Sequence, residues 1–118
     1  MESDKLLDLK EHFYNPLFTD FYQITMAHAY WVNGLQEQQA SFEAFFWECP
    51  FKGKFAIFAG LDEVVKYLRD LKFREEDIDF LKERMGPEIE EGFWDYLRTI
   101  DGSKIRVTGI KEGTIVFG

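Results

Sequence analysis

The stretch "PLFTDFYQITMAHAYWVNG", residues 16–34, decides the fold of the first part of the chain. A lone aspartate, Asp20, stands in front of sixteen consecutive residues without Asp, Glu, Lys or Arg. Asp20 can accept a hydrogen bond from an early helix amide, and Gln23 can return one in a capping box. Asn33-Gly34 is a common helix end, so the stretch predicts a helix over about 20–33.

Apolar side chains cover most of the surface of this predicted helix. They form two stripes, the first with Phe21, Ile24, His28, Trp31 and Val32 and the second with Tyr22, Met26, Ala29 and Tyr30. A helix on the surface of a globular protein typically has one apolar stripe and one polar face. We therefore expect this helix to be buried on most sides.

The start of the same helix is a candidate binding site. A helix amino terminus offers unpaired amides and positive dipole character to an anionic ligand. An aromatic ring, that of Tyr22, lies within one turn of it, so a flat anionic ring would suit the position. The alternative is structural, with Asp20 acting only as a helix cap and Tyr22 as a core residue.

Two apolar stretches after the helix predict β-strands. "ASFEAFFWECP", residues 40–50, alternates its side chains between two faces and ends at Pro50. "FAIFAG", residues 55–60, predicts a second strand, and the short connection favours antiparallel pairing of the two. The following rings are expected in the core of that sheet: Phe42, Phe45, Phe46, Phe51, Phe55 and Phe58.

Helical spacing of apolar residues predicts three further helices, one beginning at Leu61 and two within 74–85 and 88–100. "KIRVTGI" and "GTIVFG" then predict a β-hairpin around the turn "KEG", residues 111–113. The second arm of this hairpin has no successor and would offer an unpaired edge. We therefore expect an amino-terminal piece of a longer protein.

Composition indicates one globular domain, and the predicted helices and strands make it one of the α/β (α+β) class. The chain has 118 residues, of which 46% are hydrophobic and 31% charged, and this is the length of one ordinary domain. We assign residues 1–15 to an acidic leader and residues 16–118 to the domain. The net charge of −8 argues against binding to nucleic acid, which depends on clustered Lys and Arg.

Cysteine use and hydropathy indicate a cytoplasmic protein. The single cysteine, Cys49, cannot form an intrachain disulfide, and the amino terminus lacks the profile of a secretory signal. The uncharged run falls short of the roughly 18 apolar residues that a membrane span needs. We expect no interaction with a membrane.

The sequence has no motif of a self-sufficient active site. It lacks a phosphate-binding loop, H-E-x-x-H, paired C-x-x-C and G-x-S-x-G. His12 and His28 have no acidic partner at a ligand-like spacing and receive no role, and Cys49 has no nearby base and is expected to be inert. The carboxylates of "REEDIDF" and "PEIEEGF" are expected on solvent-facing helix surfaces. We predict no catalytic and no metal-binding residue in the chain.

Two ordered motifs carry a family resemblance. "LFTDFYQITMAHAYWVNG", followed by "ASFEAFFWECPFKGKFAIFAGLDEVVKYL", resembles the amino-terminal part of nicotinate phosphoribosyltransferases. In that family a T-D-x-Y-Q-x-T-M helix start precedes an F-E-x-F-F…P-F…A-G-L segment. The similarity continues through "FWDYLRTIDGSKIRVTGIKEGTIVFG" and covers residues 16–118.

The resemblance implies the amino-terminal helix-and-sheet domain of a type II phosphoribosyltransferase. Such enzymes join nicotinate to phosphoribosyl pyrophosphate, giving nicotinate mononucleotide in NAD biosynthesis, with ATP hydrolysis assisting. Their irregular α/β barrel lies downstream and holds the phosphates, Mg²⁺ and a phosphorylatable histidine. The resemblance therefore implies that this segment binds no cofactor itself and is inactive in isolation.

The resemblance also assigns roles to two residues. Tyr22 corresponds to the aromatic residue that stacks on the pyridine ring, across the interface of a homodimer with a shared active site. Asp20 lies beside it and is expected to orient the ring or nearby groups. The chain departs from the family at Trp47, where an arginine is common, which removes a positive charge. An alternative function is a non-catalytic interaction or regulatory module that pairs with a full-length homologue.

Overall fold

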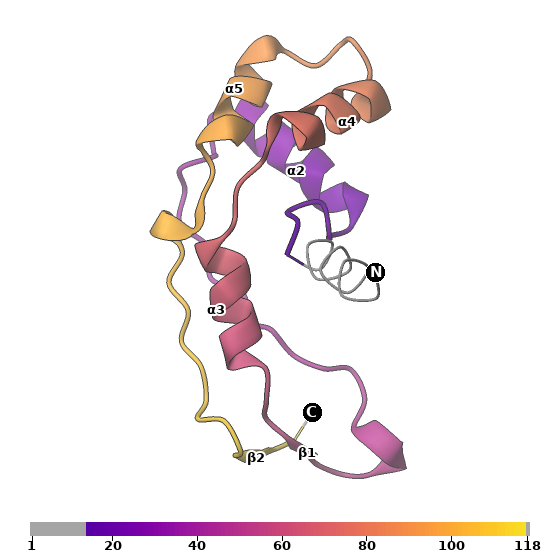
Figure 1. Cartoon of the computed structure of the whole chain (residues 1–118), viewed down its shortest axis with the longest axis vertical. Helices are drawn as coiled ribbons and strands as arrows, with labels where there is room; N and C mark the ends of the chain where they lie inside the picture. Colours follow the sequence, from indigo (N-terminus) through magenta and orange to yellow (C-terminus); the bar gives the residue numbers. More distant parts are fainter. Residues whose placement is uncertain (1–13, 118) are drawn as a thin grey trace, which may run out of the picture.

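A computed structural model describes residues 14–117, so most of the acidic leader, including His12, lies outside the described residues. The elements follow the order α2 (Phe21–Val32), η1 (Pro50–Lys52), β1 (Ala56–Ile57), α3 (Leu61–Arg69), α4 (Glu75–Met85), α5 (Glu91–Thr99), η2 (Gly102–Lys104) and β2 (Ile115–Val116). Helices α2, α4 and α5 gather at one end, while η1, β1 and β2 lie at the other, with α3 between them (Figure 1). The fold is a small mixed domain of helices and one two-stranded sheet.

The helix predicted over 20–33 is confirmed as α2. Asp20 is its N-cap, and its backbone amide donates to the side-chain oxygen of Gln23 at 3.2 Å, the returning bond of a capping box. Asn33 is the C-cap, and Gly34 follows with a φ of +71°. Glycine reaches this left-handed conformation without steric cost, which explains why the helix stops here.

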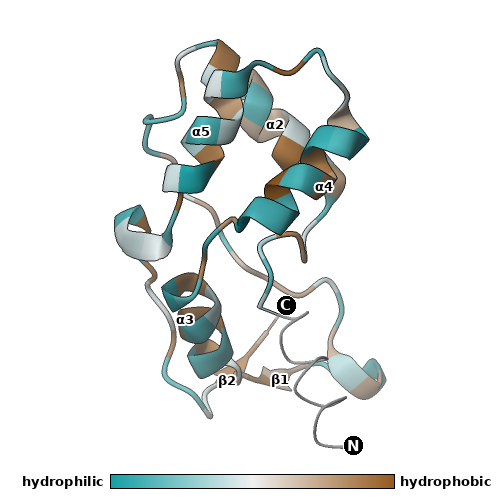
Figure 2. Cartoon of the chain, turned by 45° about the horizontal axis from the view of Figure 1, so that its top comes forward, coloured by the Kyte–Doolittle hydropathy of each residue, from teal (hydrophilic) through white to brown (hydrophobic). Residues whose placement is uncertain are grey.

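The core of the described chain lies between α2, α4 and α5. The three helices turn hydrophobic faces toward one another (Figure 2). The buried apolar residues are Ile24, Phe73, Ile78, Leu81, Phe93, Trp94 and Leu97. Burying a large apolar side chain is worth about 1.5–3 kcal/mol relative to exposure, so this cluster is the main source of stability.

His28 supports the same core from α2. Its ring lies edge-on to Phe93, with centroids 5.0 Å apart, and its Nε2 is 2.8 Å from a carboxylate oxygen of Glu90. Glu90 is the N-cap residue of α5, so the pair ties α2 to the start of that helix. A hydrogen-bonded histidine at the margin of a core needs no catalytic explanation.

The prediction that α2 is buried on most sides is wrong for the described chain. Only Ile24 of this helix is buried, and several of its large apolar side chains are about half exposed. Helices α4 and α5 cover one side of α2, and none of the other described elements covers the second apolar stripe.

The three later helices are confirmed within a few residues of their predicted bounds. Helix α3 nevertheless buries none of its side chains fully. The extended segment after η2 runs beside it (Figure 1). Where η2 meets α3, a Cβ on Gly102 would lie 2.1 Å from the carbonyl oxygen of Leu68, so only glycine permits this approach.

The prediction of a strand over residues 40–50 is wrong. These residues are irregular up to the short η1 helix, and β1, within the second predicted strand, pairs elsewhere. A β-strand needs a neighbouring strand that forms hydrogen bonds with its peptide groups. A sheet of fewer than three strands is only marginally stable in water. No described segment pairs with residues 40–49, and the one described sheet consists of β1 and β2 alone.

The predicted hairpin around residues 111–113 is also wrong. Strand β2 pairs antiparallel with β1, with Ala56 opposite Val116 and Ile57 opposite Ile115. The turn between the two predicted arms has another use, because the carboxylate of Glu112 accepts from the backbone amide of Leu61 at 2.8 Å. Glu112 therefore caps the start of α3, which holds the first predicted arm along that helix and away from β2.

The rings expected in the sheet core are mostly in solvent. Phe42 is 90% exposed, Phe45 is 74% exposed and Phe51 is fully exposed, whereas Phe46 and Phe58 are half-buried. The chain exposes 10210 Å², against about 6,700 Å² for a folded monomer of its mass. Its radius of gyration is 17.2 Å, against about 13.5 Å for a compact domain of this length.

Candidate functional site

The candidate site lies where the chain enters α2. Before the helix, residues 14–19 form turns, in which the side-chain oxygen of Asn15 accepts from the backbone amide of Leu17 at 2.7 Å. Asp20 is extended, with φ −76° and ψ 141°, and exposed. The Gln23 amide donates to the backbone carbonyl of Asp20 at 3.0 Å, whereas the amides of Phe21 and Tyr22 have no partner within the helix and lie at the positive end of the helix dipole.

A buried carboxylate fixes this entry to the rest of the molecule. Asp77 of α4 is 4% exposed and accepts from the Asn15 side-chain amide at 3.1 Å and from the Arg74 backbone amide at 2.9 Å. Sequence reasoning had placed Asp77 among solvent-facing carboxylates, and for this residue that prediction is wrong. The signal was present, since an acidic residue three positions after a helix N-cap is the returning half of a capping box.

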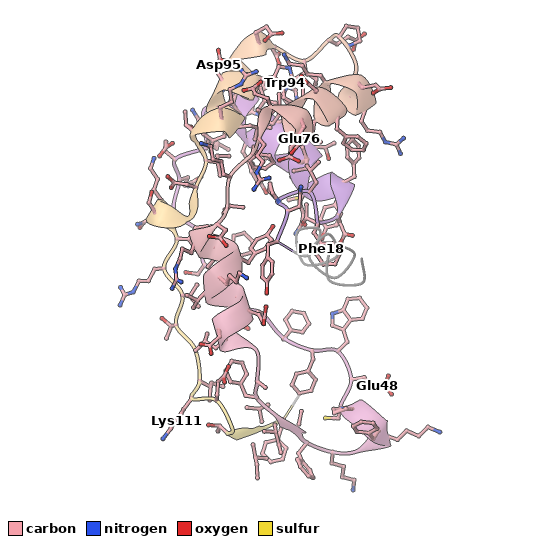
Figure 3. All side chains as sticks on the ribbon, viewed as in Figure 1. Phe18, Glu48, Glu76, Trp94, Asp95 and Lys111 are labelled. Atoms are coloured by element: carbon pink, nitrogen blue, oxygen red, sulfur yellow. The ribbon has the colours of Figure 1, made fainter. Side chains whose placement is uncertain are left out.

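Tyr22 is 58% exposed, and its hydroxyl makes no hydrogen bond to any residue within 14–117. It is therefore not a core residue of the described chain. Beside it on α2, the ring of Phe21 is 45% exposed, and the Arg84 guanidinium of α4 lies 5.9 Å from its centroid. The 62% exposed Phe18 precedes the helix (Figure 3).

The arrangement can bind a flat anion. Exposed aromatic faces supply stacking surfaces, and the amides at the start of α2 and the Arg84 guanidinium favour negative charge. The structure thus brings Asp20 and Tyr22 to one exposed helix start, as the sequence predicted. Arg84, which sequence reasoning did not select, comes near through the packing of α4 on α2.

Several of the other carboxylates in the two acidic stretches form surface pairs. Glu75 accepts from Arg98 at 2.7 Å, which lowers the pKa of its carboxyl, and Glu91 lies 3.6 Å from Lys82. Within residues 14–117, no three His, Cys, Asp or Glu side chains form a group that could hold a metal ion. No described helix is long and apolar enough to cross a membrane.

A groove of about 500 Å³ lies between α3 and the segment around η2. Its lining is largely apolar, with Val65, Leu68, Ile105 and Val107 beside Arg69 and Asp101. The Asp101 carboxylate is already engaged by the amide and hydroxyl of Ser103, which lower its pKa. The groove has no group arranged for chemistry.

Comparison with known proteins identifies the domain. Residues 17–118 match the family model described as the nicotinate phosphoribosyltransferase (NAPRTase) N-terminal domain. Nicotinate phosphoribosyltransferase 1 of Arabidopsis thaliana is 46% identical over 102 residues, which are 86% of this chain and 18% of that relative. Nicotinate phosphoribosyltransferase of Dictyostelium discoideum is 44% identical over 105 residues, 89% of this chain and 18% of the relative.

The human nicotinate phosphoribosyltransferase is 42% identical over 102 residues, 86% of this chain and 19% of the relative. The chain therefore spans less than a fifth of the length of these relatives. The search of solved structures found no significant match. The family model nevertheless covers almost the whole chain, which belongs to the nicotinate phosphoribosyltransferase family as its amino-terminal domain.

Proposed function

We propose that the chain is the amino-terminal part of an enzyme that forms nicotinate mononucleotide from nicotinate and phosphoribosyl pyrophosphate in NAD biosynthesis. In this reaction the ring nitrogen of nicotinate bonds to the ribose C1, while the bond from C1 to pyrophosphate breaks and pyrophosphate leaves with the electron pair. The proposal is supported by the family match over residues 17–118 and by the names of the relatives.

The contribution of this domain is to bind and orient nicotinate. The observation that carries this role is the exposed Tyr22 ring at the capped start of α2, inside the matched domain. The ring face would stack on the pyridine ring, and Asp20 would orient it. Holding the ring nitrogen in line with the sugar carbon lowers the barrier by positioning alone. The stacked ring would enter the active site of a partner subunit in a homodimer.

The described residues do not fit the cofactors of such an enzyme. No cluster of metal ligands is present within residues 14–117, and the sequence has no phosphate-binding loop. We assign this chain no step that involves Mg²⁺ or ATP. The rest of a full-length enzyme would supply those sites, and we expect the 118-residue chain alone to form no nicotinate mononucleotide.

A chimera tests the role of Tyr22. It would carry residues 17–118 in place of the matching segment of the Arabidopsis thaliana relative. Tyr22→Ala should lower kcat/KM for nicotinate by about tenfold or more, because a ring stack is worth about 0.5–1.5 kcal/mol beyond area and the misplaced substrate adds to the loss. Tyr22→Phe should retain most activity if the ring face binds the substrate. If the hydroxyl acts through Asp20, both Tyr22→Phe and Asp20→Ala should resemble Tyr22→Ala.

Tyr30→Ala is the matched control, since Tyr30 is on the same helix and 45% exposed, and it should leave the nicotinate KM unchanged. A Tyr22→Ala chimera with a lower melting temperature and unchanged kinetics would contradict the assignment. The alternative, a non-catalytic module that pairs with a full-length homologue, is favoured by the large exposed apolar surface. That alternative predicts that the separate 118-residue chain binds the full-length Arabidopsis thaliana enzyme and changes its activity.

A further inference from the structure

The end of the molecule opposite the helical core carries an unusual apolar surface. We name it the aromatic end surface and define it as Phe42, Phe45, Trp47, Phe51, Phe55, Ile57, Ile115 and Phe117, all at least half exposed. These residues belong to the segment that leads into η1, to η1 itself and to the region of the two short strands (Figures 1 and 3). Many large exposed apolar side chains at one end of a chain indicate an interaction site.

The backbone within this surface is held in an unfavourable conformation. Phe51 and Lys52 have φ values of +58° and +57°, in the left-handed region that non-glycine residues rarely adopt. Such residues persist where surrounding contacts impose them, yet the Phe51 side chain is fully exposed. The conformation projects the ring away from the described chain, where a partner would have to supply the missing contacts.

The segment before η1 also has unpaired peptide groups. From Ala40 to Glu48, no backbone amide or carbonyl bonds to a residue within 14–117. The same segment has the alternation of a strand, with Phe42 and Phe46 on one face and Phe45 and Trp47 on the other. A strand that is apolar on both faces is covered on both sides in a folded protein.

The size of the exposed surface indicates what covers it. The chain exposes about 3,500 Å² more than a folded monomer of its mass, well above the roughly 800 Å² that each partner contributes to an interface of standard size. The matched segment is about one fifth of each relative. The remaining four fifths of the relative's polypeptide are therefore available to cover that segment. A second copy of this chain would bring the same exposed apolar side chains.

We propose that the aromatic end surface is covered by the polypeptide that follows this domain in a nicotinate phosphoribosyltransferase, and that residues 40–47 become a β-strand by pairing with an edge strand of it. The proposal rests on the proposed function for the identity of that polypeptide. Peptide groups of an added strand provide affinity, and the alternating rings fit pockets on both sides. The irregular form of residues 40–47 is then the form of the domain without its covering polypeptide.

Hydrogen exchange measured on the chimera and on the isolated 118-residue chain tests this proposal. Amides 40–47 should exchange rapidly in the isolated chain and at least on the order of a hundredfold more slowly in the chimera. The double variant Trp47→Ser/Phe51→Ser should remove most of that protection in the chimera. Phe80→Ser is the matched control, because Phe80 is 55% exposed on α4, at the other end, and should leave the protection of 40–47 unchanged.

Three results would overturn the proposal. The first is equally fast exchange of residues 40–47 in a folded chimera, and the second is a chimera that does not fold. The third is a defined dimer of the isolated chain in which the same amides are protected, since the second copy would then be the partner. A chimera with the expected protection that forms no nicotinate mononucleotide would contradict the proposed function and support the docking proposal.

Discussion

Replacing Asp77 with alanine should destabilise the helical core strongly. The carboxylate is 4% exposed and accepts two hydrogen bonds, one from the Asn15 side chain and one from the Arg74 backbone. A hydrogen bond to a charged group is worth about 1.5–3 kcal/mol. In the alanine variant, water can replace the carboxylate in part as the partner of the two donor amides. We expect the free energy of unfolding to fall by about 2–3 kcal/mol, a large part of what a small domain has.

Urea unfolding of the 118-residue chain, followed by circular dichroism, measures this loss. Asp79→Ala is the matched control, because it removes the same charge from an exposed position on the same helix without breaking a hydrogen bond. Asp77→Asn keeps the shape and one acceptor oxygen and should lose less than alanine. Asn15→Ala removes one of the two partners, so Asn15 and Asp77 should be coupled by about 0.5–1.5 kcal/mol in a double-mutant cycle. Equal losses for Asp77→Ala and Asp79→Ala would refute the reasoning.

Two further predictions concern the packing of α5. Gly92→Ala should lower the free energy of unfolding by about 1 kcal/mol, although alanine has the better helix propensity, because the new Cβ would lie 2.9 Å from the indole of Trp31. In a Trp31→Ala background the same change should stabilise the chain. Urea unfolding measures both effects. The hydrogen bond with His28 lowers the pKa of Glu90 below its usual 4.5. A depressed carboxyl pKa contributes stability above that usual value, and the contribution is lost as pH falls through the lower value of the folded state. Glu90→Gln should therefore lower the melting temperature at about pH 7 and not at about pH 2.5, and an equal loss at both would contradict the assignment.

The helices could be predicted because their signals are local. Asp20, Gln23 and Asn33-Gly34 set the bounds of α2 within a few residues, and the neighbours that satisfy its peptide groups belong to the same segment. The same holds for α3, α4 and α5, whose apolar spacing gave their positions. The spacing does not show which face of each helix is covered, because this depends on segments that are remote in the sequence.

The strands could not be predicted because their partners are remote in sequence. The alternation at residues 40–47 is a property of the segment, whereas a strand also requires a paired neighbour, and none of the described residues pairs with this segment. Residues 104–110 alternate as well, yet Glu112 caps α3 and keeps them beside that helix. The sequence therefore indicated which segments can form strands, and the available edges decided which ones do.

The helix start that carries the candidate site was predictable for the same reason as the helices. Asp20 and Tyr22 belong to a local motif at a helix start, and the structure places both on one exposed surface. Asp77 has a local signal, its place three residues after the N-cap Arg74, although its second partner Asn15 lies sixty-two residues earlier in the chain. The two residues proposed to contact nicotinate, Asp20 and Tyr22, thus belong to one segment. The contact between Asp77 and Asn15, which fixes the position of that segment, depends on the packing of two segments.

The start of α2 can keep its geometry although the aromatic end surface, at the other end of the molecule, is not covered. The start of α2 is fixed by the buried core and by Asp77, and neither depends on the aromatic end surface. Disrupting that surface with Trp47→Ser/Phe51→Ser should then leave hydrogen exchange at the start of α2 in the isolated chain unchanged, whereas Asp77→Ala should accelerate it. If both changes accelerated exchange there equally, the two ends would unfold as one unit, and Tyr22 would depend for its position on the covering polypeptide.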